Sequence, residues 1–131
     1  MSGPAPVADV VALQRLVARY CHTLDDGDFD AFETLWAPDA EFVLRGETVR
    51  GAGAVRADLE ARQPPERRGR HLTHNLVVDV DGDRASLRSD FQFFGRDREG
   101  RPRLVFLGRY LDEAVRTDGT WRFARREIEF F

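Results

Sequence analysis

The chain has 131 residues, the size of one domain that can enclose a single core. Its formal net charge is −3 and its charged residues are mixed in sign, so neither nucleic acid nor a membrane surface is an expected partner. A single cysteine, Cys21, excludes an intramolecular disulfide. No secretory pattern opens the chain and no apolar run approaches the roughly 18 residues of a membrane span, so we expect a cytoplasmic protein.

Helical patterns dominate the first half of the chain. From Val7 to Leu24 apolar residues recur at spacings of three and four, which predicts an amphipathic helix with one buried face. Gly27 then provides a stop, and Asp28 is placed to cap the next helix, which Pro38 ends. The expected elements are a loose start over residues 1–6, helices over residues 7–24, 29–36 and 54–62, a short strand over residues 41–44 and a turn over residues 46–53.

Extended patterns dominate the second half. A polar loop over residues 63–69 contains two prolines, and we interpret the basic run Arg67, Arg68 and Arg70 as solvated. Helices followed by an antiparallel meander predict an α+β fold with the helices on one face of a curved sheet. The expected strands span residues 71–80, 84–94, 103–115 and 121–131, with Asp-Gly turn signals at residues 81–82 and 118–119.

The predicted strands mix polar and apolar residues. Arg88, Asp90 and Gln92, for example, stand among Phe91 and Phe93. A sheet with one face in water and one on a dry core would alternate more strictly. The mixing favours a sheet wrapped around a partly polar cavity, although edge strands or a subunit interface would also produce it.

Three segments resemble the SnoaL-like branch of the NTF2-like superfamily. They are Leu24-Asp25-Asp26-Gly27-Asp28-Phe29-Asp30, Leu35-Trp36-Ala37-Pro38-Asp39-Ala40-Glu41-Phe42 and Gly108-Arg109-Tyr110-Leu111-Asp112-Glu113, the last followed by Asp118-Gly119-Thr120-Trp121-Arg122. The resemblance covers residues 7–131. It implies one SnoaL-like domain over residues 1–131, a cone-shaped α+β barrel whose N-terminal helices pack in a strongly bent, mostly antiparallel sheet.

The same resemblance implies four catalytic positions. Scytalone dehydratases, bile-acid dehydratases and lindane dehydrochlorinases share an aspartate at the end of the first helix and a histidine opening a central strand. Asp25 and His71, the latter four residues before Asn75, match these two positions. Tyr20, five residues before Asp25, matches a dehydratase tyrosine, and Arg126, five residues after Trp121, matches a dehydrochlorinase arginine. Ketosteroid isomerases carry their base where Leu44 stands, so that mechanism is not expected.

Each of these positions has a catalytic and a structural interpretation. A histidine is the natural base near neutral pH, and a carboxylate on one ring nitrogen leaves the other facing a substrate. Alternatively, Asp25 caps a turn and His71 is a hydrogen-bonded barrel residue. Tyr20 is either a donor to a substrate oxygen or a core aromatic. Arg126 either stabilises a developing anion or pairs with a surface carboxylate.

Several residues are candidates for contact with a substrate. Strand parity turns His71 inward and His74 outward unless the strand bulges. Asp90 would be a second pocket carboxylate, and Asn75 either binds a ligand or closes the start of a strand. The aromatic candidates suit a small hydrophobic, cyclic substrate. The predicted substrate-binding residues are Asn75, Asp90, Trp36, Phe91, Phe106 and Tyr110.

Two classes of function remain open. The first is a cofactor-independent lyase or isomerase, foremost a dehydratase, with a polyketide cyclase using the same parts. The second is a non-catalytic ligand-binding or assembly subunit, like the dioxygenase small subunits of the superfamily. Epoxide hydrolysis would need Asp90 with Arg109 or Arg88, for which no specific spacing is visible. Neither a metal site nor a dinucleotide or phosphate motif is apparent, and we expect a homodimer or homotrimer.

Overall fold

The computed structural model describes residues 5–131, so most of the predicted loose start lies outside the described residues. The helices are α1 (Val7–Asp26), α2 (Phe29–Glu33), α3 (Ala52–Arg62) and a short 3-10 turn, η1 (Pro65–Arg67). The strands are β1 (Trp36–Leu44), β2 (Glu47–Arg50), β3 (Arg70–Asp81), β4 (Arg84–Arg96), β5 (Pro102–Thr117) and β6 (Thr120–Phe130).

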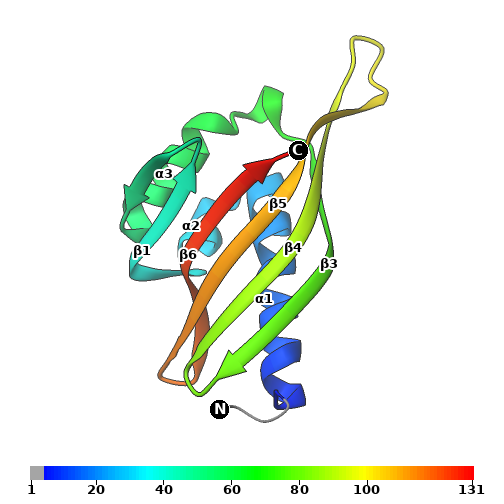
Figure 1. The fold of residues 1–131 in the computed structure, drawn as a ribbon. Coiled ribbons are helices and arrows are strands. Elements are labelled where there is room, and N and C mark those ends of the chain that lie inside the picture. Colours follow the sequence, from blue (N-terminus) through cyan, green and yellow to red (C-terminus); the bar gives the residue numbers. More distant parts are fainter. Residues whose placement is uncertain (1–4) are drawn as a thin grey trace.

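The six strands form one curled, unclosed sheet in the order β2-β1-β6-β5-β4-β3. All neighbouring pairs are antiparallel except β1 and β6, which are parallel. Helix α1 lies along one face of the sheet, and the β4–β5 hairpin extends beyond the ends of the other strands (Figure 1). The predicted α+β fold is confirmed. Among residues 5–131, no helix is long and apolar enough to cross a membrane.

The first helix ends as predicted, and the second ends earlier than predicted. Gly27 follows α1 with φ of +70°, a left-handed conformation that glycine adopts at little cost. Helix α2 has only five residues, and Trp36 is the first residue of β1. The Phe123 N–H donates to the Leu35 carbonyl at 2.8 Å and draws the chain into the sheet. Pro38 lies in the irregular part of β1, where the ladder has a register shift.

Polar and apolar residues alternate more strictly than the sequence suggests. Along β4 the residues from Ala85 to Phe93 at odd positions are buried, whereas Arg88, Asp90 and Gln92 are more exposed and lie on the opposite face. The period of two explains this, because neighbouring side chains of a strand point to opposite faces. The expected polar lining was therefore wrong for this strand. The predicted turn over residues 46–53 likewise contains β2.

An aromatic core joins the helices to the sheet. Tyr20 of α1 contacts the rings of Phe32, Trp36, Tyr110 and Phe123, with centroids 5.5–6.3 Å apart. Each of these side chains comes from a different element, so burying them together fixes α1 against α2, β1, β5 and β6. This packing positions the C-terminal end of α1 beside the start of β3.

Candidate functional site

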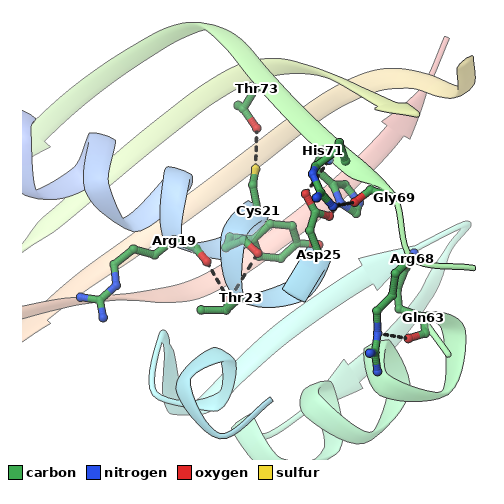
Figure 2. A network of polar contacts seen from close by, with 11 residues as sticks. Arg19, Cys21, Thr23, Asp25, Gln63, Arg68, Gly69, His71 and Thr73 are labelled. Carbon is green, nitrogen blue, oxygen red and sulfur yellow. Dashed lines mark hydrogen bonds and ion pairs between the residues drawn. The ribbon is translucent and has the colours of Figure 1, made fainter. Parts of the chain in front are cut away.

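Asp25 and His71 meet where the end of α1 lies against the start of β3 (Figure 2). Asp25 Oδ1 lies 2.5 Å from His71 Nδ1, and Asp25 Oδ2 accepts a hydrogen bond from the His71 backbone N–H at 2.8 Å. The side chains are only 6% and 8% exposed. One carboxylate therefore holds both the ring and the backbone of the histidine. Because it accepts the hydrogen on Nδ1, Nε2 is left as the acceptor nitrogen of the neutral ring.

The chain reaches this arrangement against a local electrostatic preference. Asp25 and Asp26 stand in the last turn of α1, where the helix dipole disfavours negative charge. The two hydrogen bonds from His71 offset that cost at Asp25. A tight approach also helps, since a side chain at Gly69 would overlap the Phe94 carbonyl. Glycine at this position lets the start of β3 lie close to β4 and brings His71 within reach of α1.

The His71 ring faces a cavity of about 730 Å³. The Phe93 ring packs against the His71 ring with 4.5 Å between their centroids, and the Tyr20 ring stands edge-on to the His71 ring at 6.2 Å. The aromatic side chains in the cavity wall include Phe42, Phe91, Phe93, Phe106, Tyr110 and Phe130. An apolar hollow with one oriented imidazole can bind an apolar molecule and accept a proton from it.

Two tyrosine hydroxyls belong to the same cavity. Tyr20 and Tyr110 both line it and are almost fully buried. Burial raises the pKa of Tyr20 to about 12, with the charge of Arg126 partly counteracting the rise. Burial also raises the pKa of Tyr110 well above its ordinary value. Both phenols are therefore neutral at physiological pH, which is the form that donates a hydrogen bond to a substrate oxygen.

Arg126 lies behind these tyrosines and does not line the cavity. Its side chain is fully buried, and it forms two 2.8 Å hydrogen bonds with Asp112. The guanidinium stacks on the rings of Tyr110, Tyr20 and Phe123, at 3.7, 4.3 and 4.5 Å from their centroids. Arg126 is therefore not part of a surface ion pair, and it does not reach a ligand in this cavity. Arg126 supports the two tyrosines instead.

Two predicted substrate contacts lie on the opposite face of the sheet. Asn75 Nδ2 donates to Asp90 Oδ2 at 2.9 Å, and Arg109 Nε donates to Asp90 Oδ1 at 2.8 Å, all outside the cavity of His71. A register shift between His74 and Val77, with φ of +55° at Asn75, interrupts the alternation of β3, so that Asn75 faces outward as its neighbour His74 does. Asp90 follows the alternation of β4 and points away from Phe91. His74 also faces outward, 3.2 Å from the Gln92 side chain.

Of the aromatic residues predicted to bind substrate, three line the cavity and one does not. Phe91, Phe106 and Tyr110 line the cavity, whereas Trp36 is buried in the core against Phe42 and Phe123. Phe93, which alternation along β4 places on the same face as Phe91, also lines the cavity and lies on the His71 ring. Among residues 5–131, no group of three or more His, Cys, Asp and Glu side chains gathers as metal ligands would.

The family model described as "SnoaL-like domain" matches residues 5–127. The chain belongs to this family. A relative, Uncharacterized protein Rv2910c of Mycobacterium tuberculosis, is 28% identical over 141 residues, which cover 96% of this chain and 88% of that protein.

Solved structures agree with this assignment. A variant of Rv3472, a protein of unknown function from Mycobacterium tuberculosis, superposes with a TM-score of 0.90 and 32% identity, covering 96% of this chain and 78% of that one. The "Putative Scytalone Dehydratase" of Novosphingobium aromaticivorans superposes with a TM-score of 0.84 and 27% identity, covering 95% and 85%. The SnoaL-like fold is thus shared with a protein named for dehydration.

Proposed function

We propose that this SnoaL-like protein is a cofactor-independent lyase or isomerase, in the first place a dehydratase of a small apolar ring compound. The observation that supports this most directly is the double contact of Asp25 with His71 at the wall of the cavity. A histidine held this way presents Nε2 to a bound molecule and keeps its orientation without reorganisation. The likeness to the "Putative Scytalone Dehydratase" supports the same reaction class.

The proposed elimination uses side chains on the cavity wall. His71 Nε2 takes a proton from carbon, and the electrons of that C–H bond form a new C=C bond. The neighbouring C–O bond breaks, and the departing hydroxyl leaves as water with a proton returned from the imidazolium. The Tyr20 hydroxyl donates a hydrogen bond to the oxygen on which charge develops. Asp25 stabilises the imidazolium while it carries the proton.

A purely non-catalytic binding subunit would need the hollow but not the imidazole. In such a protein the carboxylate at the dipole-disfavoured end of α1 would serve only to hold β3. The placement of the ring at the cavity wall, between Phe93 and Tyr20, favours the catalytic interpretation. Isomerisation and cyclisation begin with the same proton transfer and share this machinery.

A test of proton abstraction does not require the natural substrate. Hydroxylated bicyclic ketones are incubated with the protein in D₂O, and mass spectrometry follows both deuterium incorporation at carbon and loss of water. We expect His71→Ala to lower the faster of these rates by at least about 10²-fold. His74→Ala, which removes an imidazole from the outer face, is the matched control and should keep the parent rate. Equal rates in His71→Ala and the parent would refute the proposal.

A further inference from the structure

The mouth of the cavity is basic although the protein as a whole is acidic. Five arginines and a single glutamate, Glu66, line it, a formal charge of +4 in a chain whose net charge is −3. The arginines come from separate parts of the chain: Arg45 from the β1–β2 turn, Arg62 from the end of α3, Arg67 from the end of η1, Arg68 from the loop that follows it and Arg96 from the end of β4. Three distant stretches of sequence thus place like charges around one opening.

Most of these charges have no carboxylate partner. Arg62 pairs with Asp58 at 2.9 Å, and Asp58 does not belong to the cavity lining. Within residues 5–131, none of the ion pairs involves Arg45, Arg67, Arg68 or Arg96. Of the basic run, Arg67 and Arg68 line the cavity, whereas Arg70 does not. Like charges gathered without counter-charges repel one another, and a bound anion would relieve that repulsion.

Two of the arginines are held in place. The Arg45 guanidinium stacks on Phe130, 4.8 Å from the centroid of a ring that also lines the cavity. Arg45 has φ of +51° in its turn, a conformation that normally selects Asn or Gly. Arg68 donates from Nε to the Gln63 carbonyl at 3.2 Å, as Figure 2 shows, and lies 5.6 Å from the Phe29 ring centroid. Stacking fixes a guanidinium while leaving N–H groups at its edge available.

Apolar cavity walls below a cationic opening create a directional field. A low-dielectric wall focuses the potential at the mouth, and guanidinium groups offer paired donors that match carboxylate and phosphate oxygens. Tyr20 and His71 lie deeper, among the aromatic side chains. A molecule that complements both the cationic mouth and the aromatic interior has an apolar ring body and an anionic group at one end.

We propose that the ligand of this cavity is such an apolar anion, with its oxyanion group, a carboxylate or a phosphate, bound by Arg45, Arg67 and Arg96 and its ring body beside His71. That this ligand is also the substrate rests on the proposed function. The binding of the anion does not, because it requires no proton transfer.

Two fluorescent probes with the same ring framework test the proposal. 8-Anilinonaphthalene-1-sulfonate carries an anion that N-phenyl-1-naphthylamine lacks. We expect the parent protein to bind the anionic probe about tenfold more tightly at low salt, and the preference to shrink at high salt. The triple variant Arg45→Asn, Arg67→Gln and Arg96→Gln should lose the preference and bind the neutral probe as before. Asn is chosen at position 45 because it tolerates a positive φ.

A charge-matched triple variant gives the control. Arg15→Gln, Arg84→Gln and Arg88→Gln change three exposed arginines that do not line the cavity, and this variant should keep the preference. Competition by 1-naphthoate and by 1-naphthyl phosphate then identifies which acid the mouth accepts better. The proposal is overturned if neither acid competes, or if both triple variants bind the anionic probe alike. His71→Ala should retain the preference, so failure at the mouth and failure of the proton transfer are distinguishable.

Discussion

Two acid–base pairs that are buried within residues 5–131 differ in their surroundings. Asp25 and His71 join α1 to β3 at the wall of the cavity, whereas Asp112 and Arg126 join β5 to β6 beneath the rings of Tyr20 and Tyr110. In the proposed function, the first pair exchanges a proton with a bound molecule. The second is enclosed by aromatic rings and has no such route. If the proposed function is right, the same kind of contact serves chemistry in one place and rigidity in the other.

The charges of the enclosed pair depend strongly on each other. Burial raises the pKa of the Asp112 carboxyl, and the charge and hydrogen bonds of Arg126 counteract that rise. Burial alone would lower the pKa of Arg126, but Asp112 outweighs it and the net shift is upward. Losing one partner therefore leaves the other as an unpaired charge in a dry environment.

The largest effect on stability should come from breaking this enclosed pair. We expect Arg126→Met to lower the free energy of unfolding by about 3–5 kcal/mol, because it leaves Asp112 buried without a partner. Chemical denaturation measures the change. The double variant Arg126→Met with Asp112→Leu should recover a good part of the loss. A double variant that is no more stable than the single one would show that the charge imbalance was not the cause.

The pair at the cavity should respond in activity instead. Asp25→Asn keeps the shape of the side chain but removes its charge, so the imidazolium loses its stabilising partner. We expect kcat to fall about 10²-fold, equivalent to about 2.7 kcal/mol in the barrier. The free energy of unfolding should change by only about 1–2 kcal/mol. Asp26→Asn, at the exposed neighbouring position, is the matched control, and a similar kcat loss there would contradict the assignment.

Alkaline pH probes the tyrosines that separate the two pairs. The pKa of Tyr20 is about 12 in the folded protein and about 10 when unfolded, so above pH 10 the unfolded chain loses its proton first. The contribution of Tyr20 to stability is therefore fully present below pH 10 and falls as the pH rises towards 12. The shift corresponds to about 2–3 kcal/mol. Unfolding free energies measured by chemical denaturation at increasing pH should fall less steeply for Tyr20→Phe, in which Tyr110 and Cys21, whose pKa values burial also raises, still contribute.

The smallest effect is expected on the outer face of the sheet. Hydrogen bonds from Arg109 and Asn75 lower the pKa of Asp90, but this partly exposed group lies on the opposite face of the sheet from the cavity. Asp90→Asn should leave turnover and probe affinity at their parent values. Steady-state kinetics and the fluorescence titration check this. A marked loss of either would place a second functional site on that face.

Local patterns in the sequence were sufficient for most of the fold. The helix from Val7, the stop at Gly27 and the four long strands follow from periodicity and turn residues, and their bounds agree with the structure to within a few residues. Helix α2 ended early because a tertiary hydrogen bond drew residues 35 and 36 to β6, which no local pattern records.

The site was harder to predict because bulges change which residues meet. Counting back from the turn at residues 118–119 pairs Asp112 with Arg125, but a register shift after Glu113 pairs it with Arg126. A second shift after His74 turns Asn75 outward. Asp25 and His71 are 46 residues apart, and only the resemblance to the family suggested that they meet. Their catalytic role stays a prediction.

The Asp25 carboxylate has a second consequence at the rim of the sheet. Strand β3 is an outermost strand, and its free backbone donors could recruit an extended segment from another molecule. The His71 N–H is unavailable for such pairing, since Asp25 already occupies it. The contact that orients the imidazole therefore also blocks edge-to-edge pairing at that point, and we expect a variant that loses it to self-associate more readily.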